Sequence, residues 1–180
     1  MSLLRPFKAN DLFKFNHVNL DPYTETYSVS YYLQYICTWP NLINLAESPN
    51  GQVMGYVMGK MEGENEDWHG HVSAITISPS YRRLSLARGL MNLFEQASNQ
   101  EFCYFVDLFV RVSNSLAISM YENFGYSVYQ RISKYYSGGG IGDSLQEEDA
   151  FDMRKALSID KNKKSIRDNG REVVVDRPSF

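Results

Sequence analysis

The chain of 180 residues is long enough to form one domain with a sizeable hydrophobic core. Apolar residues make up 43% of the chain and charged residues 22%, a composition that excludes an intrinsically disordered protein. The net charge of -3 argues against a general nucleic-acid binder, because such proteins are usually basic. The sequence has no signal-peptide segment and no apolar run of about 18 residues, so neither secretion nor membrane contact is predicted.

The first part of the chain predicts a short strand followed by two helices. Residues 3–7 fit an edge strand, and Asn10-Asp11 would cap the helix that comes directly after them. A turn at Asp21-Pro22 precedes a second helix over residues 30–38, which is rich in aromatic side chains. Two short helices with so many apolar residues predict either packing onto the core or a surface that another chain covers.

A hairpin and a third strand are predicted next. The hairpin joins residues 42–47 to residues 52–62 through Asn50-Gly51, a pair typical of tight turns. Residues 72–77 form a strand that Pro79 ends, because proline removes a ladder donor.

An amphipathic helix follows, with its first turn in residues 82–87 and its end near Asn99. Residues 104–110 are apolar enough for a strand that is buried on both faces. Because a strand, a helix and a strand occur in this order, the sequence predicts a parallel crossover unit.

The last predicted helix is capped by Ser113-Asn114 and stopped by Gly125. Strands over residues 126–132 and 150–154 follow, joined by a glycine-rich loop at 138–143 that lacks the following helix of a phosphate cradle. The polar residues after Leu157 predict a loosely held tail, so the domain is expected to span residues 1–157 and the tail residues 158–180.

The turn between the strand at 72–77 and its helix has the features of an anion site. A helix N-terminus offers free backbone N–H groups and a positive dipole end, and Arg82 and Arg83 add formal charge. The small residues Ser85 and Ala87 would let a phosphate approach the backbone. The alternative is that these arginines form an ordinary solvated helix face.

Two stretches resemble the motifs of the GNAT acetyltransferases. Residues 82–87 resemble the signature Arg/Gln-x-x-Gly-x-Gly/Ala, with Ser85 in place of the first glycine. The second motif, Asn-x-x-Ala-x-x-x-Tyr-x-x-x-Gly-Phe/Tyr, is matched in register by Asn114, Ala117, Tyr121, Gly125 and Tyr126. The resemblance implies a mixed α/β fold with a central mixed sheet of about six to seven strands and helices on both faces.

The same resemblance implies acetyl-CoA as cosubstrate, with its pantetheine in a gap between two central strands that part. Asn114 would hydrogen-bond the pantetheine, and Tyr121 would face the thioester sulfur. The alternatives are a plain helix cap for Asn114 and core packing for Tyr121. The cofactor-binding residues implied in this way are Ile75, Ile77, Arg82, Arg83, Leu84, Ser85, Leu86, Ala87, Arg88, Asn114 and Tyr121.

Elementary acid–base chemistry suggests how such an enzyme would act on a protein α-amine. The pKa of an α-amine is about 7.7–8.0, so roughly a tenth to a fifth of it is neutral at pH 7. The neutral amine would attack the thioester directly, and Tyr121 would protonate the departing thiolate. His69 and His71 share one face of a strand, but a zinc site would need a third ligand, and the only other histidine is His17. No metal is therefore predicted, and His71 is expected to be a hydrogen-bond donor or proton relay in the substrate groove.

A narrower resemblance concerns the catalytic subunits of the NatB family of N-terminal acetyltransferases. It is carried by LRPFKANDLFKFN, NLDPYTETY, YYLQYICTWP, WHGHVSAI, FVDLFVRVSN and DMRKALS. The family implies a cytoplasmic enzyme that acetylates nascent chains starting Met-Asp, Met-Glu, Met-Asn or Met-Gln. It also implies a large helical-repeat auxiliary subunit that brings the enzyme to the ribosome.

That resemblance places Glu25 and Tyr27 beside the peptide backbone, Tyr135 and Tyr136 opposite, and His71 and Ser73 at the second residue. An imidazole and a hydroxyl both donate hydrogen bonds to a carboxylate or amide oxygen, so these roles are chemically reasonable. Two alternatives remain: an enzyme of the same fold that acetylates lysine or a small amine, and a non-catalytic acetyl-CoA-binding subunit.

Overall fold

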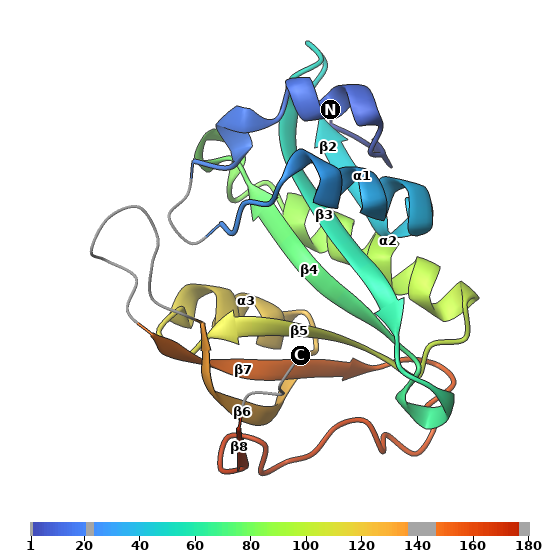
Figure 1. Cartoon of the computed structure of the whole chain (residues 1–180), viewed down its shortest axis with the longest axis vertical. Helices are drawn as coiled ribbons and strands as arrows, with labels where there is room; N and C mark the ends of the chain where they lie inside the picture. Colours follow the sequence, from blue (N-terminus) through green and yellow to red (C-terminus); the bar gives the residue numbers. More distant parts are fainter. Residues whose placement is uncertain (1, 21–23, 137–146, 177–180) are drawn as a thin grey trace. The chain divides into compact units, whose positions relative to one another are not determined.

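The computed structural model describes residues 2–20, 24–136 and 147–176, and the chain divides into two compact units (Figure 1). The first unit is Met1–Cys103 and the second is Tyr104–Phe180. The predicted domain boundary at residue 157 stays a prediction, and so does the crossover unit, which extends over both units.

The first unit contains an antiparallel sheet in the order β1-β2-β3-β4. The strands are β1 (Leu3–Pro6), β2 (Ile43–Glu47), β3 (Val53–Glu62) and β4 (His69–Ile77). These elements confirm the predicted edge strand, the hairpin and the strand over 72–77. The hairpin turn requires a glycine at position 51, where φ is 80°.

The helices α1 (Val29–Thr38) and α2 (Leu86–Gln100) pack on opposite faces of this sheet (Figure 1). On the α1 face, Tyr32 and Tyr35 join a buried aromatic cluster around Tyr56. On the α2 face, a Cβ added at Gly59 would come within 2.5 Å of the Phe94 ring, so that glycine permits close approach of helix and strand. Helices therefore cover both faces of the sheet in this unit, as predicted.

The predicted helix after Asn10-Asp11 is instead a short 3-10 helix over Ala9–Phe13, which begins before the expected cap. Asp11 does not sit at its start but inside it, where its carboxylate accepts a hydrogen bond from the Lys8 amide at 2.8 Å and two more from Arg5. Asp11 is only 4% exposed, and its carboxylate can be buried because these donors satisfy it. The predicted turn at Asp21-Pro22 lies outside the described residues.

The second unit contains β5 (Phe105–Arg111), α3 (Ser115–Asn123), β6 (Ser127–Tyr136), β7 (Glu148–Ala156) and β8 (Val174–Val175). Strand β7 pairs antiparallel with both β5 and β6, and β8 adds to β6 in parallel. The predicted strands and the helix stopped by Gly125, where φ is 93°, are all present. The glycine-rich loop at 138–143 lies outside the described residues.

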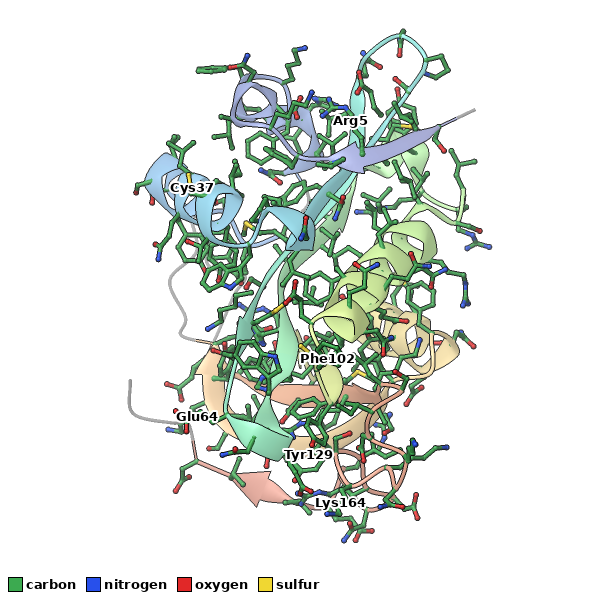
Figure 2. All side chains as sticks on the ribbon, turned by 90° about the vertical axis from the view of Figure 1, so that its right-hand side faces the viewer. Arg5, Cys37, Glu64, Phe102, Tyr129 and Lys164 are labelled. Carbon is green, nitrogen blue, oxygen red and sulfur yellow. The ribbon has the colours of Figure 1, made fainter. Side chains whose placement is uncertain are left out.

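The expectation of a loosely held tail is wrong for residues 158–176, which pack on the second unit (Figure 2). Asp160 is 5% exposed and accepts hydrogen bonds from the Ser165 hydroxyl at 2.6 Å and from the amides of Lys164 and Ser165. Burial acts to raise the pKa of Asp160, but these hydrogen bonds hold it below its ordinary value. Arg167 is half-buried and lies 3.6 Å above the Tyr129 ring, whereas Lys161, Lys163 and Lys164 are exposed.

We expect Gly170→Ala to displace this segment. A Cβ at this position would lie 1.8 Å from the carbonyl oxygen of Val128 on β6, so the backbone must move. The free energy of unfolding should fall by about 1–3 kcal/mol, in the range of other overpacked sites. Trypsin cleavage near Lys161 and Lys164 should become faster, and chemical denaturation together with limited proteolysis checks both effects. Unchanged cleavage would contradict the observed packing.

Candidate active site

The turn from β4 into α2 differs from the prediction, because α2 starts at Leu86 and not near Tyr81. Residues Pro79–Tyr81 form a short 3-10 turn, and Arg83 and Ser85 have φ of 66° and 59°. An α-helix requires negative φ, so it cannot begin before the second of these left-handed residues. The hydrophobic pattern of residues 79–85 does not indicate that the helix starts this late.

The local geometry brings the predicted pyrophosphate residues to one exposed turn. Leu86 is buried with Ala46 and Met54 and anchors the helix start, while Arg82, Arg83 and Ser85 are exposed ahead of it. The Arg82 Nε lies 3.4 Å from the Ile77 carbonyl, to which it donates. First-turn amides of a helix together with three arginines, at 82, 83 and 88, suit a diphosphate, so these residues fit the phosphate end of coenzyme A. This role stays a prediction.

We expect Ser85→Gly to stabilise the protein. Serine holds a left-handed backbone conformation at this helix start, and no side-chain hydrogen bond caps the helix there. Glycine adopts the same conformation without the steric cost, which should raise the free energy of unfolding by about 1 kcal/mol. Thermal unfolding measures the shift, and calorimetry with coenzyme A tests whether the glycine also tightens phosphate binding. A lowered unfolding temperature would contradict the assignment of strain to Ser85.

Ile75 and Ile77 lie on β4, the last strand of the first unit. They stand opposite Val57 and Gly55 of β3, and both side chains are half-buried. Their predicted contact with pantetheine stays a prediction.

A network of tyrosine hydroxyls surrounds Ser73 in the middle of β4. The Tyr27 hydroxyl donates to the Ser73 carbonyl at 3.1 Å, and the Ser73 and Tyr35 hydroxyls lie 3.0 Å apart. The β3–β4 register shifts at this point, so Ser73 forms a bulge that turns its polar groups toward the tyrosines. Tyr31 extends the network, with its hydroxyl 2.8 Å from that of Tyr35 and its ring stacked on Tyr27.

Two of these tyrosines, Tyr27 and Tyr31, are protonated at neutral pH. Burial raises the pKa of Tyr27, and the nearby Tyr31 and Glu25 add to the effect. Burial likewise raises the pKa of Tyr31. Glu25 is exposed two residues before Tyr27, and Tyr27 is the member of the predicted pair that the structure brings to the Ser73 bulge. Tyr31 and Tyr35 were missed in the sequence because their helical spacing equally fits core packing.

His71 lies two residues before Ser73 on β4 and is 9% exposed. His69, on the same face, donates a hydrogen bond from its Nδ1–H to the Asp67 carbonyl. Both imidazoles lie near the Glu62 carboxylate of β3, a residue that the sequence did not single out.

Asn114 and Tyr121 belong to the second unit. Asn114 caps α3, and its side-chain oxygen accepts from the Ala117 amide at 3.1 Å. The cap is therefore real, and the hydrogen bond from Asn114 to pantetheine stays a prediction. Tyr121 is 7% exposed, with its ring 6.1 Å from that of Tyr126. Burial raises the pKa of Tyr121, so its hydroxyl is protonated at neutral pH, the state that a general acid requires.

Tyr135 and Tyr136 end β6 and pack against β5. The Tyr136 hydroxyl donates to the Phe109 carbonyl at 3.1 Å, and the Arg111 guanidinium lies 4.0 Å from the Tyr136 ring centre. Arg111 is 6% exposed and lies 3.6 Å from a Glu148 carboxylate oxygen. The sequence assigned no role to Arg111, although an arginine that ends the apolar run FVDLFV was a usable signal.

Over residues 2–20, 24–136 and 147–176, no three His, Cys, Asp or Glu side chains are grouped as metal ligands. In the same part of the chain, no helix has the length and apolar character that crossing a bilayer requires.

The fold and the motif residues agree with comparisons to known proteins. The sequence profile of the Acetyltransferase (GNAT) family matches residues 12–126. The chain belongs to this family of mixed α/β acetyltransferases, and the predicted fold class is confirmed.

Individual relatives define the subfamily of the chain more narrowly. The chain is 51% identical to the N-terminal acetyltransferase B complex catalytic subunit NAA20 of Arabidopsis thaliana, over 100% of this chain and 99% of the relative. The crystal structure of Chaetomium thermophilum Naa20 with a bisubstrate analogue is 40% identical, with a TM-score of 0.90 over 97% of this chain and 96% of that one. A NatB acetyltransferase complex bound to CoA and MES gives 43% identity and a TM-score of 0.76 over 86% and 99%. Within the acetyltransferases, the chain belongs to the NatB catalytic subunits.

Proposed function

We propose that this chain transfers acetyl from acetyl-CoA to the α-amine of nascent chains that begin Met-Asp, Met-Glu, Met-Asn or Met-Gln. The observation that carries the proposal is the similarity over the whole chain to a catalytic subunit of the N-terminal acetyltransferase B complex. The tyrosine network around Ser73, with His71 beside it, supports the substrate class because it gathers several hydrogen-bond donors around one strand.

In the proposed site, Glu25 and Tyr27 hold the backbone of the substrate's first residues, with Tyr135 and Tyr136 as further peptide contacts. Tyr27 is suited to this because its hydroxyl is already oriented by the Ser73 carbonyl. His71 and Ser73 contact the second side chain, whose carboxylate or amide oxygen accepts their hydrogen bonds.

The proposed reaction needs no acyl-enzyme. The neutral α-amine attacks the thioester carbonyl carbon, the C–N bond forms and the C–S bond breaks. The thiolate takes the phenolic proton of Tyr121, and the proton lost by the amine leaves through water. Tyr121 is protonated at neutral pH, the state from which an acid donates, and the burial that raises its pKa also makes the phenol a weaker acid.

We also propose that the chain works in the cytoplasm with a large helical-repeat auxiliary subunit at the ribosome. The N-terminal segments leave several apolar side chains exposed, which fits a covered surface. These residues are Phe13, Leu20, Val29 and Leu33.

A peptide panel tests the proposal. The chain, with any partner that co-purifies, should acetylate a Met-Asp peptide and not the same peptide with a blocked N-terminus and an internal lysine. A Ser-Glu peptide should be acetylated poorly. Acetylation of the blocked peptide would instead favour a lysine acetyltransferase, and coenzyme A binding without turnover on any peptide would favour a non-catalytic subunit.

A further inference from the structure

The end of the β3–β4 hairpin carries a compact cluster of charged and titratable side chains. In the antiparallel register, Glu62 stands opposite His69 and Lys60 opposite His71, so all four side chains share one face. One oxygen of Glu62 lies 3.8 Å from the Nε2 of His69 and 3.9 Å from the Nδ1 of His71. Its other oxygen lies 2.5 Å from the Lys60 ammonium.

This geometry couples Glu62 to both imidazoles. The side chains of His69 and His71 are 9% and 11% exposed, so nearby charges are screened less than they are in water. The carboxylate favours a proton on the Nδ1 of His71. A neutral imidazole with its proton there would offer only a lone pair at Nε2, whereas an imidazolium donates from both nitrogens.

We infer that Glu62 is a positioning residue that keeps His71 in its doubly protonated form and thereby sets the preference for acidic over amide second residues. The inference rests on the proposed function of His71. An imidazolium attracts Asp and Glu by charge as well as by hydrogen bonding, while Asn and Gln use the hydrogen bond alone. Glu62 does not touch substrate in this account, and it acts through His71.

Other groups in the first unit also affect His71. Lys60 opposes its protonation, as does a protonated His69, and the tyrosines contribute only as neutral dipoles. The titratable groups around this face are Lys60, Glu62, His69, Tyr31, Tyr35, Tyr27 and Glu25.

The test is the pH dependence of a specificity ratio. The ratio of kcat/KM for a Met-Asp peptide to that for a Met-Asn peptide cancels the titration of the shared α-amine. In the wild type this ratio should fall as pH rises and His71 loses its proton. In Glu62→Gln the fall should occur about one pH unit lower, the effect of one charge about 4 Å away. Lys60→Met should move the fall to higher pH.

A matched control separates this account from a general field effect. Glu64 is exposed on the same hairpin (Figure 2), and Glu64→Gln removes an equal charge, so its profile should match the wild type. If Glu62→Gln raises the ratio by the same factor at every pH, Glu62 only repels acidic substrates and the inference is overturned.

NMR titration of His71 without any peptide tests the inference independently of turnover. The midpoint should be about one pH unit lower in Glu62→Gln than in the wild type, again as expected for a charge at this distance. An unchanged midpoint would overturn the inference. Absence of wild-type turnover on Met-Asp, with a shifted midpoint, would instead overturn the proposed function.

Discussion

Tyr121→Phe should lower kcat on a Met-Asp peptide by about 100-fold to 1,000-fold, the usual contribution of a positioned general acid. The buried phenol is protonated at neutral pH, the state from which it can give a proton to the leaving thiolate. The substitution keeps the ring that packs 6.5 Å from Phe124 and 6.1 Å from Tyr126. The fold and coenzyme A affinity should therefore be nearly unchanged.

Steady-state kinetics and calorimetry with coenzyme A separate the chemical step from binding. Tyr126→Phe is the matched control, since it removes a hydroxyl from the neighbouring buried ring without touching the proposed acid. Its kcat should stay within about threefold of the wild type, as for most changes away from the reacting atoms. A Tyr121→Phe enzyme with wild-type kcat would show that another group supplies the proton.

Most of the secondary structure could be predicted because local patterns and tertiary packing agree. The hairpin through Asn50-Gly51 and the helix between Asn114 and Gly125 each carry a specific turn or cap signal, and both are present. The start of α2 could not be predicted, because the left-handed conformation of Arg83 and Ser85 has no signature in residues that usually avoid it.

The C-terminal segment shows why composition misleads. Its lysines and arginines suggest a solvated tail, but Asp160 and Arg167 make buried or stacked contacts with residues far away in the sequence or within a tight turn. The stacking of Arg167 depends on the tertiary fold, and the hydrogen bonds of Asp160 depend on a tight turn, and neither follows from local periodicity.

Site residues that belong to a sequence motif could be predicted. Site residues that depend on contacts with a neighbouring strand could not. Tyr27, Ser73 and Asn114 were singled out, and each makes the polar contacts described above. The bulge that presents Ser73 is a property of strand pairing, which a single strand does not reveal. Glu62 was missed for the same reason, since it meets the histidines only across the hairpin.

Asp11→Asn should lower the free energy of unfolding by about 2 kcal/mol at neutral pH, because the half-buried Arg5 loses one of its two carboxylate partners. The Asp11 carboxylate accepts from both terminal nitrogens of Arg5, at 2.7 and 2.9 Å, and from the Lys8 amide. Arg5 also pairs with Glu47 of β2, so Asp11 links the N-terminal segment to the sheet. That segment includes Phe15, which packs on Tyr32 of α1.

The effect of Asp11→Asn should depend on pH with a definite sign. The hydrogen bonds from Arg5 lower the pKa of Asp11, burial opposes them, and the Lys8 amide adds to the lowering. A lowered folded-state pKa contributes stability above the unfolded value of about 3.9, and this stability is lost as pH falls through the folded value. The gap between wild type and Asp11→Asn, from urea unfolding between neutral and acidic pH, should therefore be constant above about pH 5 and shrink below it. Asp168→Asn, at an exposed carboxylate, should differ from the wild type by less than about 0.5 kcal/mol, and a gap for Asp11→Asn that grows at acidic pH would contradict the pairing with Arg5.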